Sequence, residues 1–313
     1  TDDGEICELP IADFWVTLLK SINQAIEKAE INPNELIAVS YSSQANSFVL
    51  LDETDNPLTP LILWPDKRAG RVPSALQSIL EKRDFLKKTG LGISPGLQSM
   101  AAKIVWFQEN KPEIWEKLNS IASVSDYLTF SLTGQKVSDF STSSMTGLFD
   151  VSEEKWWNEA LETLNINKNF LFSPKRTGSF VGTLAGERAI QLGLSADTKF
   201  FLGGLDHHMV AVGAGLTNST RVSESTGTVL ACVNYRQGFC PRAGINIAPG
   251  LREGYYFQMA FNENGATALE WYQKKFAPEL SIEELLRMAE SIAPGSDGLK
   301  ASPCVDKFES LSG

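Results

Sequence analysis

The chain has 313 residues, of which 42% are hydrophobic and 21% are charged, and its formal net charge is −10. This length can hold two domains and a large core, and the composition excludes a disordered protein. The acidic balance argues against a nucleic-acid partner, because a nucleic-acid surface needs clustered Lys and Arg. No apolar run reaches the length of a membrane span, so we expect no membrane partner either.

Cysteine and histidine residues give no sign of a metal site. The four cysteines (Cys7, Cys232, Cys240 and Cys304) are scattered, and no two have zinc-ligand spacing. The adjacent His207 and His208 have no partnering cluster in the sequence. We therefore predict no metal ligands among the side chains and a reduced, cytoplasmic location.

Strands and helices are expected to alternate along most of the chain. Hydrophobic periodicity and turn residues predict a helix at 11–30, strands at 36–40, 48–52 and 61–64, and helices at 74–88, 101–110 and 112–119. A segment at 124–132 starts strand-like and turns helical, and helices at 152–164 and 187–192, a strand at 200–202 and a helix from Asp206 follow. Beyond Gly215 we expect β-structure at 221–233 and 255–260 and helices at 266–276 and 282–292. This alternation predicts an α/β fold with a partly parallel sheet.

The segment 203–215, GGLDHHMVAVGAG, joins a short apolar strand to a helix through two glycines and one acid. The turn Ser225-Thr226-Gly227-Thr228 follows, with hydroxyls and backbone N–H groups suited to a phosphate. A carboxylate beside a phosphate-binding turn is the minimum needed for phosphoryl transfer to a hydroxyl. The pattern alone leaves two interpretations of Asp206 open, a general base and a plain helix cap.

Six segments stand in a consistent order: VSYSSQANSFVLLD at 39–52, PLTPLILWPDKR at 57–68, KIVW at 103–106, SDYLTFSLTGQKVSDFSTSSMTGLFD at 125–150, GGLDHHMVAVGAG at 203–215 and STGT at 225–228. In order and spacing they resemble the signature segments of the FGGY carbohydrate kinases. The resemblance covers nearly the whole chain, and its weight lies in the six segments together, since each one alone is weak.

The resemblance implies the actin-like, ribonuclease-H-like ATPase fold, an α/β architecture with a mixed sheet flanked by helices and two domains, the second incomplete. Residues 1–217 would form the N-terminal sugar-binding domain, incomplete at its start, and 218–313 would begin the C-terminal nucleotide-binding domain. The family's glycine-bearing phosphate hairpin and its adenine-binding region have no counterpart in these residues. We therefore expect this polypeptide alone to have little kinase activity.

The resemblance also implies a reaction, the phosphorylation of a hydroxyl on a ketose such as a pentulose, on a sugar acid or on a polyol, with ATP and Mg²⁺. By position, Asp206 would be the general base, and Thr226 and Gly227 would face the transferred phosphoryl group. Gly265 and Ala266 would lie on the nucleotide side. The sugar pocket would be formed by Gln44, Asn46, Trp64, Asp66, Arg68 and Gln98. The expected partner is a small-molecule sugar, and a homodimer is the candidate assembly.

Several of these residues have a second interpretation. Trp64 can be a core residue or a sugar-stacking one, and Asp66 and Arg68 can form a structural ion pair. The two histidines are more typical of supporting or surface groups than of proton shuttles. Ala45-Asn46 stands where xylulose kinases carry Met-His and glycerol kinases Arg-Glu, which favours neither substrate.

Two other functions compete with a sugar kinase. One is a non-catalytic sugar-binding or regulatory protein on a kinase scaffold. The retained Asp206 argues against it, and the missing phosphate hairpin argues for it. The other is an actin-like or acetate-kinase-like ATPase without a sugar substrate, against which the segment 57–68 speaks.

Overall fold

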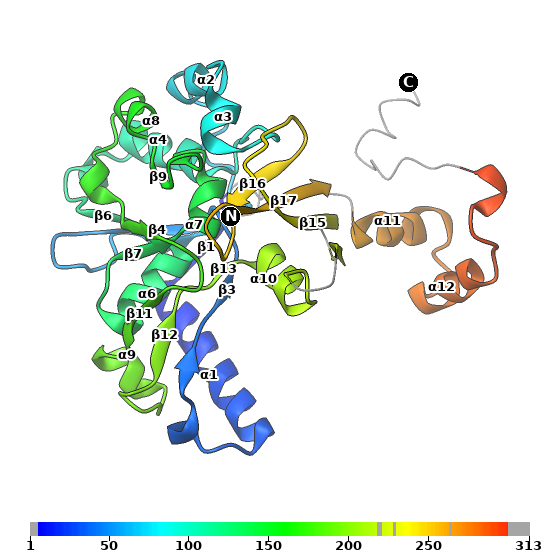
Figure 1. The fold of residues 1–313 in the computed structure, drawn as a ribbon, viewed down its shortest axis with the longest axis horizontal. Coiled ribbons are helices and arrows are strands. Elements are labelled where there is room, and N and C mark those ends of the chain that lie inside the picture. The colour runs from blue at the N-terminus through cyan, green and yellow to red at the C-terminus, as the bar shows by residue number, and fades with distance from the viewer. Residues whose placement is uncertain (1–5, 218–220, 228–229, 263–264, 300–313) are drawn as a thin grey trace.

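A computed structural model describes residues 6–217, 221–227, 230–262 and 265–299 (Figure 1). The first and larger part is an α/β unit that contains β1 (Glu8–Leu9), α1 (Ile11–Ala29), β2 (Ala38–Val39), β3 (Ser42–Ser43), β4 (Phe48–Leu51), β5 (Leu61–Ile62), α2 (Ser74–Leu80), α3 (Phe85–Thr89), α4 (Met100–Asn110), α5 (Pro112–Trp115), β6 (Ser120–Ser123), α6 (Val124–Thr133), β7 (Val137–Asp139), α7 (Phe140–Ser143), β8 (Phe149–Asp150), β9 (Lys155–Trp156), α8 (Asn158–Thr163), β10 (Ser173–Lys175), β11 (Phe180–Thr183), α9 (Gly186–Gln191), β12 (Lys199–Phe201), β13 (Gly204–Leu205) and α10 (Asp206–Gly213). The second part contains β14 (Val222–Thr226), β15 (Leu230–Gln237), β16 (Asn246–Pro249), β17 (Tyr255–Asn262), α11 (Ala266–Phe276) and α12 (Ile282–Glu290).

Strand β4 lies at the centre of the first part and is buried on both faces. It pairs antiparallel with β5 and β6 in the sheet order β1-β5-β4-β6. Phe48 and Leu50 face a core that includes α2, α4 and α8, whereas Val49 and Leu51 face a second core against α1 and α6. This two-sided burial explains why the strand reads as an unbroken apolar run and not as an alternating one.

Two parallel strand pairs bring distant parts of the chain together beside these cores. Strand β12 pairs with β2, and β13 pairs with β3 in the register Gly204↔Ser42 and Leu205↔Ser43. A Cβ at Gly203 would overlap the backbone carbonyl of Tyr41, so only glycine permits this approach. The carboxyl ends of β3 and β13 therefore lie side by side, and ligand sites in α/β folds form at such ends.

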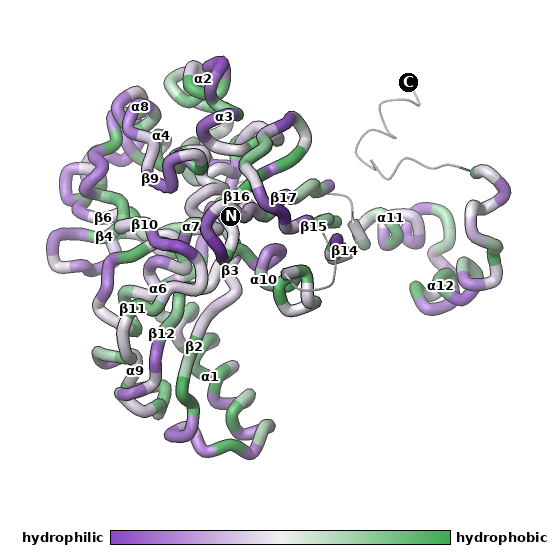
Figure 2. The backbone as a smooth tube through the Cα atoms, in the orientation of Figure 1, coloured by the Kyte–Doolittle hydropathy of each residue, from purple (hydrophilic) through white to green (hydrophobic). Residues whose placement is uncertain are grey.

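The second part is an antiparallel sheet in the order β14-β15-β17-β16, and α10 packs against its inner face through a third core that includes Ala211, Ala231 and Phe257. Helices α11 and α12 extend away from this sheet (Figure 1). Figure 2 shows hydrophilic and hydrophobic residues interspersed along α1 and α12, as expected for amphipathic helices. In the described part of the chain, no helix combines the length and apolar character that crossing a membrane requires.

Most predicted elements are present, and three predictions about segments were wrong. The single helix at 74–88 is two short helices, α2 and α3, and the turn between them lets Phe85 pack against Trp157. The helix at 152–164 is instead the hairpin strand β9 followed by α8, because Trp156 donates from its indole Nε1 to the carbonyl of Phe172 at 2.7 Å. The strand expected from residue 124 ends at Ser123, where a capping box starts α6.

Candidate active site

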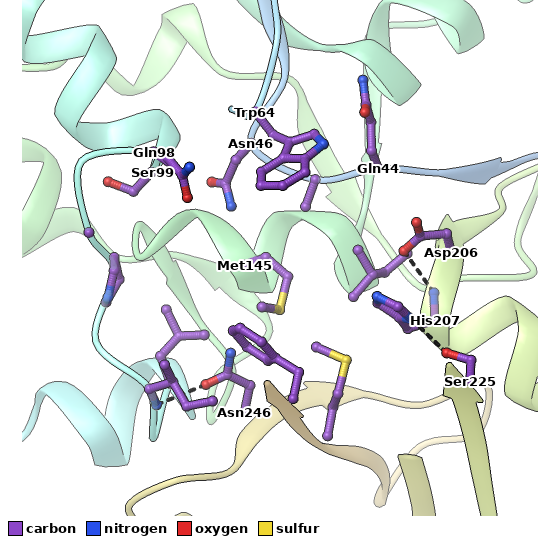
Figure 3. A pocket seen from close by; sticks show the side chains of 18 of the residues that line it. Gln44, Asn46, Trp64, Gln98, Ser99, Met145, Asp206, His207, Ser225 and Asn246 are labelled. Atoms are coloured by element: carbon purple, nitrogen blue, oxygen red, sulfur yellow. Dashed lines mark hydrogen bonds between the residues drawn. The ribbon is translucent and has the colours of Figure 1, made fainter. Parts of the chain in front are cut away.

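A pocket of about 720 Å³ lies where the first part meets the second sheet (Figure 3). Its described wall comes from the loop after β3, the residue Trp64 after β5, the segment 91–99, the start of α10, and the strands β14, β16 and β17. In Figure 3, Trp64, Asn46 and Gln98 lie on one side of the pocket, and Asp206 and His207 lie near Ser225 on another. Residues more than 150 positions apart in the sequence thus share one cavity.

Asp206 is the first residue of α10 and lines the pocket. The helix N-cap is Leu205, and no side chain caps this end of the helix. The Asp206 Oδ1 atom accepts a 2.8 Å hydrogen bond from the backbone N–H of His207. The positive end of the helix dipole favours a carboxylate at this place. Asp206 is therefore not a typical cap, and its half-buried carboxylate is available to a ligand.

The two adjacent histidines face different environments. His207 lines the pocket, and its Nδ1 lies 3.0 Å from the Ser225 hydroxyl of β14. His208 is 1% exposed, stacks on Phe257 at 4.5 Å and pairs through Nδ1 with the Ser141 hydroxyl at 2.8 Å. Burial, and then the neighbouring His207, lower the pKa of His208 to about 3, so this imidazole is neutral.

Four of the six predicted sugar-pocket residues line the pocket: Gln44, Asn46, Trp64 and Gln98. Asn46 has a positive φ of 61°, and its Oδ1 accepts a 3.0 Å hydrogen bond from the backbone of Met100 at the start of α4. The side chain of Asn46 is thereby fixed beside the pocket. Trp64 is 39% exposed, an unusual exposure for a core residue, and its backbone N–H donates to the Ser47 hydroxyl at 2.8 Å.

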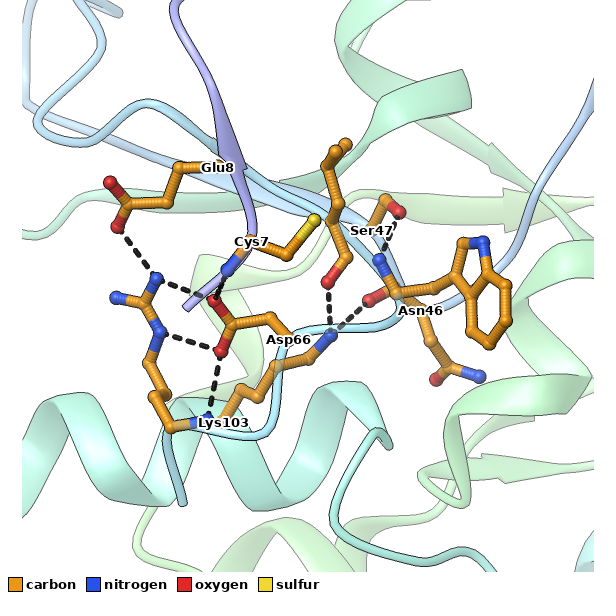
Figure 4. Close-up of polar contacts among 9 residues, drawn as sticks. Cys7, Glu8, Asn46, Ser47, Asp66 and Lys103 are labelled. Atoms are coloured by element: carbon orange, nitrogen blue, oxygen red, sulfur yellow. Dashed lines mark hydrogen bonds and ion pairs between the residues drawn. The ribbon is translucent and has the colours of Figure 1, made fainter. Parts of the chain in front are cut away.

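Asp66 and Arg68 lie outside the described pocket wall and form a buried ion pair behind it (Figure 4). The two oxygens of Asp66 accept hydrogen bonds from the backbone and guanidinium of Arg68 and from the backbone of Cys7, at 2.7–3.0 Å. Burial would raise the pKa of Asp66, but the hydrogen bonds from Arg68 and Cys7 outweigh it and lower that pKa. The geometry favours the ion-pair interpretation of these two residues over direct contact with a sugar.

Lys103 of α4 completes this buried layer. Its Nζ donates to the backbone carbonyls of Asn46 at 2.8 Å and Leu63 at 2.9 Å, as Figure 4 shows. Burial lowers the pKa of Lys103 to about 7, although the charge of Asp66 opposes the shift. The two carbonyls belong to the residue Asn46 and to the residue before Trp64. Lys103 therefore ties together the backbone segments that carry two pocket side chains.

Thr226 and Gly227 line the pocket from the end of β14, whereas Thr228 lies outside the described residues. The Thr226 hydroxyl donates to Glu224 at 2.9 Å. Gly265 and Ala266 are absent from the described pocket wall, but the backbone N–H of Ala266 donates to the Gly227 carbonyl at 2.6 Å. The start of α11 thus lies directly behind the Thr226–Gly227 turn, and the Ala266 N–H is already committed.

The structure adds pocket residues that the sequence pattern did not indicate. Met145, Met259 and Phe261 form apolar wall, and Asn246 of β16 is a polar side chain only 3% exposed. The Asn246 Oδ1 accepts a 3.0 Å hydrogen bond from the backbone of Ile93. The only sequence signal for Asn246 as a pocket residue was a single Asn at the start of a short apolar strand. That signal is weak, because the residues around Asn246 in space come from distant segments.

Comparison with known proteins identifies the family. The family model for the N-terminal domain of the FGGY family of carbohydrate kinases matches residues 3–213, which is more than half of the chain. The chain belongs to the FGGY family of carbohydrate kinases. The predicted resemblance is thereby confirmed.

Relatives and solved structures agree with this assignment. The chain is 29% identical over 296 residues to a xylulose kinase of Lactococcus lactis, covering 94% of this chain and 58% of that protein. It is 27% identical over 278 residues to a gluconokinase of Bacillus subtilis, covering 85% of this chain and 53% of that protein. The crystal structure of ligand-bound xylulose kinase from Lactobacillus acidophilus superimposes with a TM-score of 0.80 at 23% identity, covering 94% of this chain and 59% of that one.

These likenesses confirm the predicted fold class, an α/β actin-like ATPase fold. The chain spans little more than half the length of the relatives that it matches. A statement about activity therefore concerns the whole gene product and is made below as a proposal.

Proposed function

We propose that this chain contributes the sugar pocket and one wall of the phosphoryl-transfer site of an ATP-dependent carbohydrate kinase, with Asp206 as the general base. The observation that carries the proposal is the shared pocket itself. Asp206, the loop residues Gln44 and Asn46, and the Thr226–Gly227 turn all line one cavity. An acceptor hydroxyl, its base and a phosphate-binding turn are the parts that phosphoryl transfer needs.

In this proposal the sugar lies against Gln44, Asn46 and Gln98, whose amides both donate and accept hydrogen bonds. Trp64 covers one face of the sugar. The hydroxyl to be phosphorylated lies against the Asp206 carboxylate, which takes its proton as the oxygen attacks the γ-phosphate. Lys103 acts from behind the wall, because its Nζ holds the backbone carbonyls of Asn46 and of Leu63, the residue before Trp64. Asp66 and Arg68 form the ion pair behind this wall.

ATP is the proposed phosphate donor, as for carbohydrate kinases in general, with its γ-phosphate at the Thr226–Gly227 turn. Mg²⁺ neutralises charge on the phosphates when it is bound, and it is commonly held by substrate phosphates and water with one or two carboxylates. Within the described residues, no group of three or more His, Cys, Asp or Glu side chains converges. We therefore propose that Mg²⁺ is carried mainly by the nucleotide, and we assign the ion no ligand among the described side chains.

We also propose that the boundary between the two family domains falls near residue 217, between α10 and β14. Residues 1–217 would then carry most of the sugar contacts, and the part from 218 would carry the nucleotide side. A cytoplasmic location and a homodimer stay predictions.

The test is Asp206→Asn in the full gene product, assayed with a panel of ketoses, polyols and sugar acids. The substitution keeps size and hydrogen bonding but removes the proton acceptor, and loss of a positioned base lowers kcat about 10²–10⁴-fold. Sugar affinity, measured by tryptophan fluorescence, should stay near its wild-type value. Asp197→Asn is the matched control, because Asp197 is exposed and lies outside the described pocket wall.

Near-normal turnover in Asp206→Asn would refute the base assignment. A wild-type gene product that binds sugar but consumes no ATP would instead indicate the sugar-binding protein without catalysis.

A further inference from the structure

The described wall of the pocket has an unusual charge composition. Asp206 is the single acidic side chain among the described lining residues, and none of them is Lys or Arg. His207, next to Asp206, is the one imidazole among the described lining residues. The rest of this wall consists of amides, hydroxyls and apolar side chains.

Two basic side chains behind the wall, Lys103 and Arg68, already have hydrogen-bond partners. Lys103 is fully buried and donates to two backbone carbonyls. The side chain of Arg68 is 5% exposed and pairs with Asp66 at 2.8 Å and Glu8 at 2.6 Å. Redirecting either group toward a ligand would leave buried carbonyls or a buried carboxylate without a partner, which is costly.

On the side of the pocket where the sugar is proposed to lie, beside Gln44, Asn46 and Gln98, this composition suits an uncharged group and disfavours an anionic one. The phosphates of ATP are proposed at the Thr226–Gly227 turn instead, where Mg²⁺ would supply the positive charge. A carboxylate or phosphate placed on the sugar would lose water in a half-apolar cavity and would face Asp206. Sugar hydroxyls are neutral donors and acceptors, and the amides of Gln44, Asn46 and Gln98 match them without any buried charge.

Asn246 is the polar residue of the apolar side of the pocket. It is 3% exposed and lies opposite Met259 in the β16–β17 pairing, and Met145 and Phe261 line the same pocket. Its Oδ1 is fixed by the backbone N–H of Ile93, so the amide cannot rotate freely. Figure 3 shows the amide nitrogen of Asn246 pointing into the pocket. A fixed, buried donor of this kind discriminates strongly, because a ligand that fails to pair with it leaves it unsatisfied.

We propose that the pocket takes an uncharged sugar, a ketose or a polyol and not a sugar acid or sugar phosphate, and that Asn246 is a specificity residue that donates a hydrogen bond to one sugar oxygen. This inference rests on the proposed kinase function and names its substrate class. It selects between two substrate types found among relatives, since one relative is a xylulose kinase and another a gluconokinase.

The first experiment compares matched neutral and acidic substrates in the full gene product. Each polyol and ketose of five or six carbons is assayed beside the aldonate of the same chain length and beside the corresponding sugar phosphate. We expect kcat/KM for the best neutral sugar to exceed that for its aldonate by about tenfold or more, the ratio that 1.4 kcal/mol of unfavourable charge burial produces. Equal or better use of the aldonate or the sugar phosphate overturns the inference and leaves the kinase function standing.

The second experiment is Asn246→Asp, with Asn169→Asp as a control that adds the same charge at an exposed residue outside the described pocket wall. The new carboxylate keeps an acceptor for Ile93 but replaces the donor by a negative charge. We expect KM for the neutral sugar to rise about tenfold or more, while KM for ATP and the melting temperature stay close to those of the control.

An unchanged sugar KM in Asn246→Asp, or a rise in both KM values together, overturns the role of Asn246. Absence of phosphorylation of any sugar, neutral or acidic, by the wild-type gene product refutes the proposed function, and the inference falls with it.

Discussion

Replacing Asp66 by Asn separates a structural ion pair from a sugar contact. The wild-type carboxylate accepts hydrogen bonds from Cys7 and Arg68 with both of its oxygens. An Asn side chain offers one oxygen, so its amide nitrogen must face either the N–H of Cys7 or that of Arg68. Breaking a buried ion pair by removing one partner costs about 3–5 kcal/mol. The lower end applies here because Glu8 still pairs with Arg68.

This cost translates into a drop in melting temperature of about 6 °C or more, at about 2 °C per kcal/mol for a chain of this size. The matched control is Asp52→Asn. Asp52 also accepts hydrogen bonds, from Thr54 and Asn56, and also has a lowered pKa, but it lies in a surface turn without an ion pair. We expect the control to melt within a degree or two of wild type. Sugar affinity in Asp66→Asn, measured below its melting range, should change little.

The pH dependence supplies a second readout for Asp66. Its folded-state pKa is lowered, so the stability that it contributes is present above the ordinary carboxyl pKa of about 4. That contribution is lost as the pH falls through the lowered value. Asp66→Asn should therefore flatten part of the acid-side loss of stability. A variant that melts like wild type but loses sugar affinity would refute the ion-pair interpretation and return Asp66 to the sugar pocket.

Two further predictions follow from burial. Trp64→Ala should weaken sugar binding while lowering the melting temperature far less than Trp15→Ala, because Trp64 is 39% exposed and Trp15 is 1% exposed. A core tryptophan costs about 3–5 kcal/mol on truncation, so a large drop in melting temperature with intact sugar affinity would contradict the stacking role. Burial, and then the charge of Asp139, raise the pKa of Asp126 to about 7, so wild-type stability should fall as the pH rises from about 4 to about 7. In urea unfolding, the free energy of unfolding of Asp126→Asn should differ less between pH 5 and pH 7 than that of wild type. An equal difference in the two proteins would contradict the assignment.

The local sequence pattern correctly predicted the elements in which hydrophobic periodicity or an apolar run alone defines the structure. The helix at 266–276 coincides with α11, and the unbroken apolar run at 48–52 contains β4. The helix at 74–88 was wrong because periodicity is nearly continuous through a tight turn, and only the packing of Phe85 on Trp157 shows the break. The helix predicted at 152–164 was wrong for the same kind of reason, since the partner of Trp156 is the carbonyl of Phe172.

The candidate site divides in the same way. Asp206, Gln44, Asn46, Trp64 and Gln98 were predicted through the resemblance to the family's segments, and all of them line the pocket. Asp66 and Arg68 belong to the same motif as Trp64, and sequence proximity could not tell a pocket residue from the ion pair behind it. Asn246 carries no motif, because its importance arises from Ile93 and Met259, which meet it only in the folded chain.

The two histidines show how one motif combines packing with chemistry. The Ser141 hydroxyl accepts the backbone N–H of Leu205 at 3.0 Å and lies 2.8 Å from Nδ1 of the neutral His208. One buried side chain thus fixes both Leu205, the residue before Asp206, and His208 in the first turn of α10. Successive residues of a helix point about 100° apart, so His207 faces the pocket while His208 stacks in the core. The residues GGLDHH therefore determine where the Asp206 carboxylate lies as well as supply it. If Asp206 is the proposed base, a change at His208 should lower kcat through the position of Asp206.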